Sequence, residues 1–322
     1  MTRVLVTGAG GFIGHHLVSA LKKKGYFVRG ADWVLPEYEA SHADEFLQLD
    51  LRRWENCLIA SQGMDQIYNL AANMGGIGFI ETHKAEIVHD NTLINVHMID
   101  AARQCQVSRY LYTSSACIYP GYLQNSPDVS PLKESDAYPA DAEDGYGWEK
   151  LYTERLCRHY FEDYGLKTYS VRFHNIFGPL GTYDGGREKS PAAICRKIAL
   201  AANPDQIEVW GDGEQTRSFC YIDDCIEGLY RLMQSEHHEP LNLGQDRLIT
   251  INELVDIVAK IANKTITKAY DLSKPQGVRG RNSDNTQLET ALQWRPQISL
   301  EDGLARTYEW IQSELIAAGR CQ

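Results

Sequence analysis

Hydrophobic residues in the first half of the chain fall into short runs, separated by longer segments with helical periodicity. The runs are rich in β-branched and aromatic residues, and they predict strands at residues 3–7, 26–31, 45–49, 66–70, 109–113 and 167–173. In the segment that ends near Gln104, apolar residues recur every three or four positions, which predicts a helix with one buried face. The alternation of strand and helix predicts an α/β fold built on a doubly wound parallel sheet.

Beyond residue 173 this alternation loosens. We expect residues 1–173 to form the sheet domain, with some later segments returning to it, and residues 174–322 to form mainly a smaller C-terminal α/β portion. Residues 210–213 have the composition of a hairpin turn. Residues 252–261 predict a helix with Asn252 as its cap.

A glycine-rich turn joins the first strand to the first helix. Gly8, Gly11 and Gly14 are spaced three apart, with Phe12 and Ile13 between the last two. Such glycines allow a tight turn, a close approach of backbone N–H groups to a pyrophosphate, and close packing of helix on strand. The turn therefore predicts a dinucleotide site in a Rossmann-type domain.

Polar and small residues follow the next strands. Asp32 ends the second strand, where a carboxylate can bind the adenosine ribose hydroxyls and repel a 2′-phosphate, so NAD is favoured over NADP. The alternative for Asp32 is a solvated turn residue. Asp50 and Leu51 end the third strand and suit an adenine edge, and Ala71 after the fourth lets a cofactor pass close to the backbone.

The strongest candidate for chemistry is the stretch around residues 111–150. Ser115 and Cys117 follow a strand, and Tyr146 and Lys150 are four apart, so they share one face of a predicted helix. A phenol has an ordinary pKa near 10 and needs a neighbouring cation to exchange protons at neutral pH. We therefore expect Lys150 to lower the pKa of Tyr146. For Cys117 a buried inert thiol is the alternative.

Basic residues gather in the second half of a chain whose net charge is −11. Arginine suits bidentate binding of phosphate oxygens, so they predict a diphosphate pocket, with scattered solvated charge as the alternative. These residues are Arg187, Lys189, Arg196, Lys197, Arg217, Arg279 and Arg281. A glycine-rich segment at residues 73–79 is interpreted as a backbone wall for the substrate rather than only a flexible loop.

The composition narrows the class of protein. The acidic balance argues against a nucleic-acid or anionic-membrane surface, and no apolar run approaches the roughly 20 residues of a membrane helix. The first residues enter a strand at once, so we expect no signal peptide. Eight cysteines without CxxC pairs or zinc spacing indicate reduced thiols, no metal site and a cytoplasmic location.

Together these residues resemble the extended short-chain dehydrogenase/reductase superfamily and, within it, the family of GDP-mannose 3,5-epimerases. The resemblance covers nearly the whole chain and is carried by residues 74–80, 114–120, 173–176, 185–189, 215–219 and 277–284. Three residues depart from the family pattern: Asn73 where an acid is usual, Ile77 where methionine is common, and Trp148 between the tyrosine and lysine.

The resemblance implies an epimerase that converts GDP-α-D-mannose to GDP-β-L-galactose and GDP-L-gulose. Bound NAD would transiently oxidise C4, with Tyr146 as base, Lys150 at the nicotinamide ribose and Ser115 on the C4 oxygen. Cys117 and Lys189 would then act as base and acid at C3 and C5. Inversion would require their pKa values to move toward neutrality.

The resemblance also implies the binding residues and a homodimer. The cofactor contacts would come from Gly8, Gly11, Phe12, Ile13, Gly14, Asp32, Asp50, Leu51, Ala71, Tyr146 and Lys150. The substrate contacts would come from Gly75, Ser115, Ala116, Cys117, Tyr146, Asn175, Glu188, Lys189, Ser190, Lys197, Gln215, Thr216, Arg217 and Arg281. Two alternatives remain: a nucleotide-sugar 4-epimerase or 4,6-dehydratase, and a non-catalytic NAD-binding regulator on the same fold.

Overall fold

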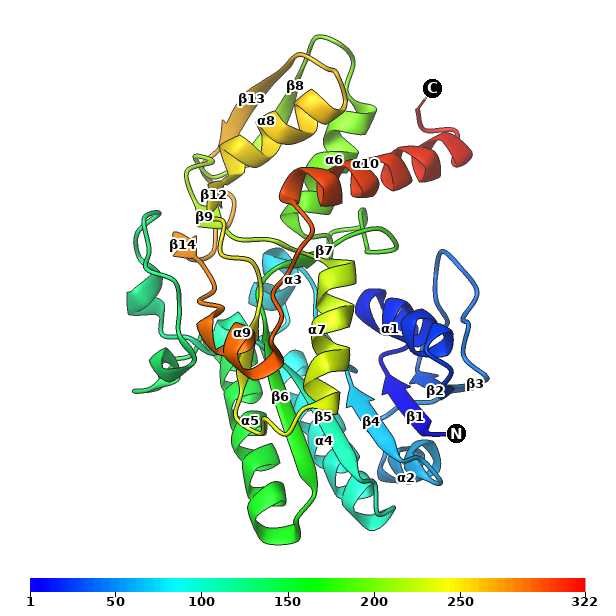
Figure 1. Cartoon of the computed structure of the whole chain (residues 1–322). Helices are drawn as coiled ribbons and strands as arrows, with labels where there is room; N and C mark the ends of the chain where they lie inside the picture. The colour runs from blue at the N-terminus through cyan, green and yellow to red at the C-terminus, as the bar shows by residue number, and fades with distance from the viewer. Residues whose placement is uncertain (322) are drawn as a thin grey trace.

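The computed structural model describes residues 1–321, apart from the side chain of Ile77. Ile77 is one of the three departures from the family pattern, and its side chain therefore lies outside the described part of the chain. A seven-stranded, entirely parallel sheet forms the centre of the molecule (Figure 1). Its order is β11-β6-β5-β4-β1-β2-β3. The strands are β1 (Arg3–Thr7), β2 (Phe27–Asp32), β3 (Glu45–Gln48), β4 (Gln66–Asn69), β5 (Arg109–Ser115), β6 (Lys167–Phe173) and β11 (Leu241–Leu243).

Helices cover both faces of this sheet. Strand β1 shows why, since Val4 and Val6 pack into one hydrophobic core and Leu5, between them, packs into the other. Helices α1 (Phe12–Lys23) and α7 (Ile222–Gln234) pack together on one face, and α2 (Trp54–Ser61), α4 (Lys84–Gln104) and α5 (Asp144–Tyr164) pack on the other. The predicted doubly wound α/β fold is confirmed, with predicted strand ends within two residues of the observed ones.

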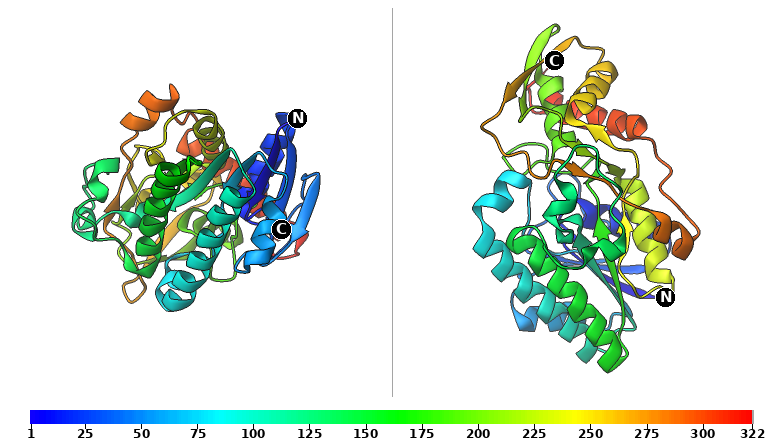
Figure 2. Two further views of the ribbon diagram at one scale, coloured as in Figure 1. Left: turned by 90° about the horizontal axis from the view of Figure 1, so that it is seen from below. Right: turned by 90° about the vertical axis from the view of Figure 1, so that its left-hand side faces the viewer.

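Most of the remaining elements form a smaller portion stacked at one end of the sheet (Figure 2), whereas α9 (Thr286–Leu292) packs against β11 and α7 beside the sheet. Strands β8 (Asp205–Trp210) and β13 (Ile266–Asp271) pair in parallel there. Strand β9 (Thr216–Arg217) lies between β12 (Ile249–Thr250) and β14 (Gly280–Arg281). The remaining named elements are α3 (Ile77–Thr82), β7 (Ile176–Phe177), α6 (Ser190–Leu200), β10 (Cys220–Tyr221), α8 (Ile251–Ile261), α9 (Thr286–Leu292) and α10 (Leu300–Ala317). The division at residue 173 stays a prediction; β11 and α7 belong to the sheet layers although they come later.

Two local predictions in this portion are wrong. The turn at residues 210–213 does not close a hairpin, because β8 pairs with β13 and the strand beyond the turn pairs with β12 and β14. Helix α8 begins one residue before Asn252 and is capped by Thr250, whose side chain accepts from the Glu253 backbone N–H at 3.0 Å. Glu253 reaches back to the Thr250 N–H and completes a capping box.

Within residues 1–321, every helix is too short or too polar to cross a lipid bilayer.

Candidate active site

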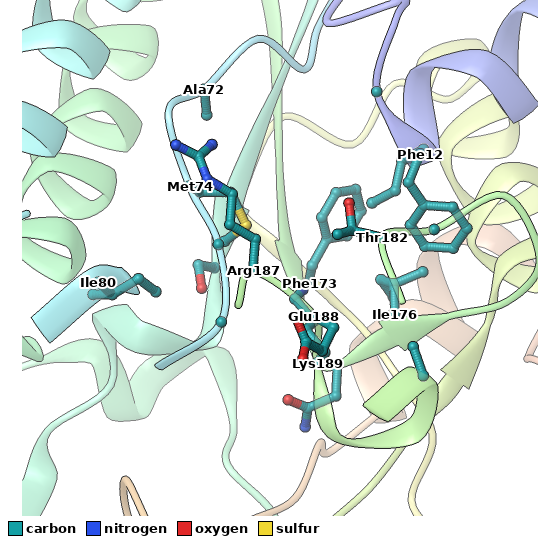
Figure 3. Close-up of a pocket in the computed structure, with 18 of the residues that line it drawn as sticks. Phe12, Ala72, Met74, Ile80, Phe173, Ile176, Thr182, Arg187, Glu188 and Lys189 are labelled. Atoms are coloured by element: carbon teal, nitrogen blue, oxygen red, sulfur yellow. The ribbon is translucent and has the colours of Figure 1, made fainter. Parts of the chain in front are cut away.

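One large cavity of about 1160 Å³ lies between the carboxyl ends of the central strands and the smaller portion. All the residues predicted to bind the cofactor line it, as do all the predicted substrate residues except Thr216. In Figure 3, Phe12, Phe173, Ile176 and Thr182 lie on one side of this space, and Ala72, Met74 and Ile80 on the other. The volume exceeds that of an ordinary pocket for one drug-sized ligand, roughly 300–1,000 Å³, so two ligands can share it.

The β1–α1 turn forms a cradle for an anionic group. A Cβ on Gly14 would lie 2.0 Å from the Gly8 carbonyl oxygen, and Gly8 itself has φ +67°. A Cβ on Gly11, by contrast, would meet only the Gly8 carbonyl oxygen, at 3.3 Å. The absence of a side chain at Gly11 therefore leaves space on the outer side of the turn. Helix α1 begins at Phe12 without a side-chain cap, which leaves its first N–H groups available. These features fit a dinucleotide pyrophosphate.

Asp32 closes the next part of the cavity at the end of β2. Its carboxylate accepts from the backbone N–H of Gly10 at 2.9 Å and of Val34 at 3.2 Å, and burial raises its pKa. Asp50, at the end of β3, is held differently, because Arg52 donates to both of its oxygens at 2.9 Å and lowers its pKa. The predicted adenine contact of Asp50 would therefore compete with an ion pair.

The predicted proton-handling residues converge at the end of β5. Lys150 donates to the Thr113 carbonyl oxygen at 3.1 Å, and its Nζ lies 5.6 Å from the centre of the Tyr146 ring. The hydroxyl of Ser115 accepts from the Cys117 backbone N–H at 3.2 Å. Gly147 explains the close approach of helix and strand end, because a Cβ there would lie 2.2 Å from the Cys117 carbonyl oxygen.

The electrostatics of Tyr146 differ from the expectation. Burial raises its pKa, the neighbouring Cys117 and Glu149 charges add to this, and a hydrogen bond with Ser115 opposes it. Burial also lowers the pKa of Lys150, whose side chain is only 2% exposed. Desolvation of the phenol therefore raises the pKa of Tyr146, and desolvation also disfavours the charged form of the lysine that was expected to lower it.

Cys117 has a partner that sequence reasoning did not assign to it. Arg281 donates from Nη1 to Cys117 Sγ at 3.5 Å, from Nε to Gln124 Oε1 at 2.6 Å, and from Nη2 to Glu143. Burial, followed by the Glu143 charge, raises the pKa of the Cys117 thiol, whereas Arg281 lowers it. The pKa of Cys117 thus moves away from neutrality, contrary to expectation, and Arg281 is the group that counteracts the shift.

Lys189 approaches from the loop before α6, beside Glu188 and Arg187 (Figure 3). Its side chain lines the cavity and is exposed to the space within it, and desolvation by the surrounding protein lowers its pKa, as predicted for the acid partner. The charge of Cys117 raises that pKa, which places the two groups within electrostatic reach. The loop is fastened across the cavity by the Gly76 N–H, which donates to the Arg187 carbonyl oxygen at 3.0 Å.

Paired strands bring two cations together beside Cys117. Arg217 on β9 and Arg281 on β14 are direct partners in the sheet. Burial and the neighbouring Arg281 charge lower the pKa of Arg217 to about 10. Among residues 1–321 the guanidinium of Arg217 donates to the carbonyl oxygens of Thr216 and Gln276, at 2.7 and 3.2 Å, and no carboxylate pairs with it. Such a half-buried cation, without a carboxylate partner among these residues, suits an anionic ligand.

Three further predicted substrate residues, Thr216, Asn175 and Gln215, differ in how they meet the cavity. Thr216 is outside the cavity wall, because alternation along β9 turns it away and its hydroxyl donates to the Pro127 carbonyl oxygen. Asn175 has φ +45° and donates to the Ser218 carbonyl oxygen at 2.9 Å. Gln215 lines the cavity, donates to the Trp210 carbonyl oxygen at 3.0 Å, and keeps a buried Oε1 without a partner among the described residues.

Residues 4–244 match the model of the NAD dependent epimerase/dehydratase family, which is about three quarters of the chain. The chain belongs to the NAD dependent epimerase/dehydratase family. GDP-mannose 3,5-epimerase 1 of Oryza sativa subsp. japonica is 47% identical over 97% of this chain and 82% of its own length. GDP-mannose 3,5-epimerase of Arabidopsis thaliana is likewise 47% identical, over 97% and 83%. GDP-L-fucose synthase of Escherichia coli is 31% identical over 96% of both chains.

Solved structures of epimerases share the fold. A UDP-glucose 4-epimerase from Thermotoga maritima, with UDP-glucose, has a TM-score of 0.88 and 24% identity over 98% of this chain and all of its own. The UDP-glucose 4-epimerase of Thermus thermophilus, in complex with NAD, has a TM-score of 0.83 and 23% identity over 97% and 99%. This chain thus shares its fold with these structures at low sequence identity.

Sequence reasoning about this epimerase/dehydratase chain missed Glu143 and Gln124, the residues that hold Arg281 beside Cys117. Glu143 had a detectable signal, because it precedes Tyr146 by only three residues, and the structure makes it the N-cap of the helix that carries Tyr146. Gln124 is fully buried at the end of a short 3₁₀ helix (Gly121–Gln124), and nothing in its local sequence distinguishes it.

Proposed function

We propose that this protein is a GDP-mannose 3,5-epimerase, which converts GDP-α-D-mannose to GDP-β-L-galactose and, by inversion at C5 alone, to GDP-L-gulose. One observation carries the proposal: a thiol, Cys117, and an amine, Lys189, face one cavity beside the Ser115, Tyr146 and Lys150 set. Inversion at carbon requires proton removal on one face and delivery on the other, and therefore two separate groups. The relatives that are 47% identical carry the same name.

NAD, when bound in the β1–α1 cradle, supplies reversible hydride removal at C4, which makes the C3 and C5 protons acidic because both carbons become α to a ketone. The turn glycines and Asp32 fit the pyrophosphate and ribose of this cofactor. Tyr146 takes and returns the proton of the C4 hydroxyl. Ser115 donates to the C4 oxygen and stabilises its developing charge.

Cys117 removes the proton at C3 or C5 as a thiolate, and Arg281 stabilises that thiolate from 3.5 Å. Lys189 delivers a proton on the opposite face, which its lowered pKa favours. The half-buried Arg217 and the buried Arg281 bind the diphosphate that links base and sugar.

A nucleotide-sugar 4-epimerase is the second candidate, because UDP-glucose 4-epimerases have the same fold. Such an enzyme needs the Tyr146 and Lys150 pair but gives no role to Cys117. The contacts that Arg281 makes with Cys117, Glu143 and Gln124 therefore favour the 3,5-epimerase.

Proton NMR of the NAD-loaded enzyme with GDP-mannose in D₂O tests the proposal. We expect deuterium at C3 and C5 and formation of GDP-L-galactose, with both lost in Cys117→Ala. The matched control is Cys105→Ala, which removes a half-buried thiol that lies outside the cavity. Absence of exchange in the folded wild-type enzyme, or full exchange in Cys117→Ala, would contradict the proposal.

The homodimer also stays a prediction. Two large aromatic side chains, Trp148 and Tyr152, are about half exposed on α5, at 49% and 51%, and follow each other by one helical turn. They lie on the helix that also carries Tyr146 and Lys150, and sedimentation velocity of wild type beside Trp148→Glu would test whether this surface pairs with a second copy.

A further inference from the structure

The loop that carries Lys189 contacts the opposite wall of the cavity through the side chain of Arg187. The guanidinium carbon of Arg187 lies 3.9 Å from the centre of the Phe79 ring on α3. A cation over an aromatic face at this distance is attracted by the negative charge of that face. His83 stacks on the same ring, with the ring centres 4.3 Å apart, and supports it from within the helical segment. Two segments that are far apart in sequence therefore meet at Arg187 and Phe79, which we call the clasp.

Backbone contacts bring the two segments close enough for the clasp to form. The Gly76 N–H donates to the Arg187 carbonyl oxygen at 3.0 Å. A Cβ on Gly76 would lie 2.7 Å from the Glu188 carbonyl oxygen, so this crossing requires a residue without a side chain. A Cβ on Gly75, a predicted substrate contact, would lie 2.9 Å from the Phe79 Cβ. The clasp is therefore in direct contact with the wall that is predicted to hold the sugar.

The loop itself can move at one end. The two glycines at residues 185–186 have φ +89° and +88°, and a Cβ on either would meet nothing within 4 Å. On the other side Glu188 accepts from Arg196 on α6 at 3.2 Å, and Lys189 is the N-cap of that helix. These contacts hold the loop to α6 but not to the opposite wall. The contact of Arg187 with α3 therefore determines how closely Lys189 approaches that wall.

We propose that Arg187 and Phe79 are positioning residues, which hold the loop closed so that Lys189 reaches the sugar on the face opposite Cys117. With the clasp closed, the Cys117 thiolate takes the proton from the carbon beside the C4 ketone, and the Lys189 ammonium gives a proton to the other face of the enolate. With the clasp open, the Cys117 thiol returns a proton to the face it came from, and the configuration is retained. This inference rests on the proposed function, and it moves Arg187 from the predicted diphosphate pocket to the catalytic loop.

The balance of inversion and retention in D₂O tests the clasp. Proton NMR of the NAD-loaded enzyme measures deuterium in recovered GDP-mannose, which marks retention, and deuterium in the inverted products. A partly exposed cation–π contact is worth a factor of about two to five in the closed population. Arg187→Ala and Phe79→Ala should each lower the inversion-to-retention ratio by about this factor. The double variant should lower it no further, since either substitution alone removes the pair, and Arg187→Lys should restore most of the ratio.

Arg3→Ala is the matched control, because the Arg3 guanidinium carbon lies 3.8 Å from the centre of the Phe27 ring and neither residue lines the cavity. A loss of folded enzyme lowers inversion and retention together and leaves their ratio unchanged. An unchanged ratio in both clasp variants, or an equal fall in Arg3→Ala, would overturn the inference. Weaker GDP binding in Arg187→Ala but not in Phe79→Ala, measured by isothermal titration, would also overturn it, because Arg187 would then bind the diphosphate.

Amide hydrogen exchange separates the clasp from the reaction, because it needs no turnover. Each variant is measured on the segment opposite its substitution. Arg187→Ala should speed exchange in residues 74–80, and Phe79→Ala in residues 183–190, each by about two- to fivefold. This acceleration, without deuterium in any sugar from the wild type, would remove the reaction and leave the clasp. Sugar exchange in the wild type, with unchanged ratios and unchanged amide exchange in the variants, would remove the clasp alone.

Discussion

Replacing Glu143 by glutamine should make Cys117 a stronger acid. The thiol and the carboxylate are bridged by one guanidinium, that of Arg281, with Cys117 Sγ 3.5 Å from Nη1 and Glu143 bound to Nη2. Burial first, and the Glu143 charge second, raise the pKa of Cys117. Glu143→Gln removes this second contribution and leaves Arg281 without its carboxylate, so both changes favour the thiolate.

The size of the effect follows from the geometry. Across the guanidinium, the thiolate and carboxylate lie about 7 Å apart, which corresponds to a repulsion of about 2 kcal/mol at an effective dielectric constant near 20. The Glu143 side chain is 27% exposed, so solvent screening reduces this to about 1 kcal/mol. At a pH below the Cys117 pKa, the thiolate fraction should therefore rise about fivefold.

Alkylation by iodoacetamide reports this fraction directly, because the thiolate is the reacting species. The rate at the Cys117 peptide, measured by mass spectrometry across pH, should follow a profile displaced to lower pH in Glu143→Gln. The acid limb of deuterium exchange into GDP-mannose should move in the same direction. Asp144→Asn is the matched control, since it removes a carboxylate from the next residue, one that pairs with Lys84.

The reasoning would be refuted by a Glu143→Gln profile that is unshifted or displaced to higher pH while the variant keeps its thermal midpoint. An equal displacement in Asp144→Asn would also refute it, because the effect would then belong to the general charge of the helix start rather than to the bridge through Arg281.

Two further substitutions test the scaffold. Glu154→Ala should destabilise the protein by about 3–5 kcal/mol in urea unfolding, because it leaves Arg172, which is 2% exposed and bound to Glu154 at 2.8 and 2.9 Å, without its carboxylate. Glu162→Ala removes an exposed ion pair and should leave the stability nearly unchanged, so equal losses would contradict this account. Gly14→Ala should destabilise by about 1–3 kcal/mol and abolish NAD retention measured after gel filtration, because its Cβ would strike the Gly8 carbonyl. Retention at the wild-type level would show that the turn tolerates the shift.

The features that could be predicted from sequence are those encoded locally. The glycines of the β1–α1 turn, Asp32, and the pair Tyr146 and Lys150 each depend on spacing within one strand, turn or helix, and the structure places them all on the cavity. The alternation of short apolar runs with helical segments likewise predicted the parallel sheet, because both faces of such a sheet are buried.

What sequence could not provide depends on contacts between distant segments. The contact between Arg281 and Cys117 joins residues 164 positions apart, and its Glu143 and Gln124 partners are recognisable only once the chain is folded. The composition of residues 210–213 predicted a hairpin, but the strand before this turn, β8, pairs with β13, which begins more than fifty residues later at Ile266. The local sequence does not reveal such a distant partner. The raised pKa values of Tyr146 and Cys117 come from burial, which spacing does not reveal.

The long reach of Arg281 has a consequence for the newly made chain. During synthesis, Cys117 leaves the ribosome about 160 residues before the arginine that stabilises its thiolate, and the sheet domain can fold in that interval. Until β14 docks on β9, the thiol has no Arg281 beside it. Catalytic competence therefore arises at the end of translation, and a chain that stops before residue 280 would lack the cation that its thiolate requires.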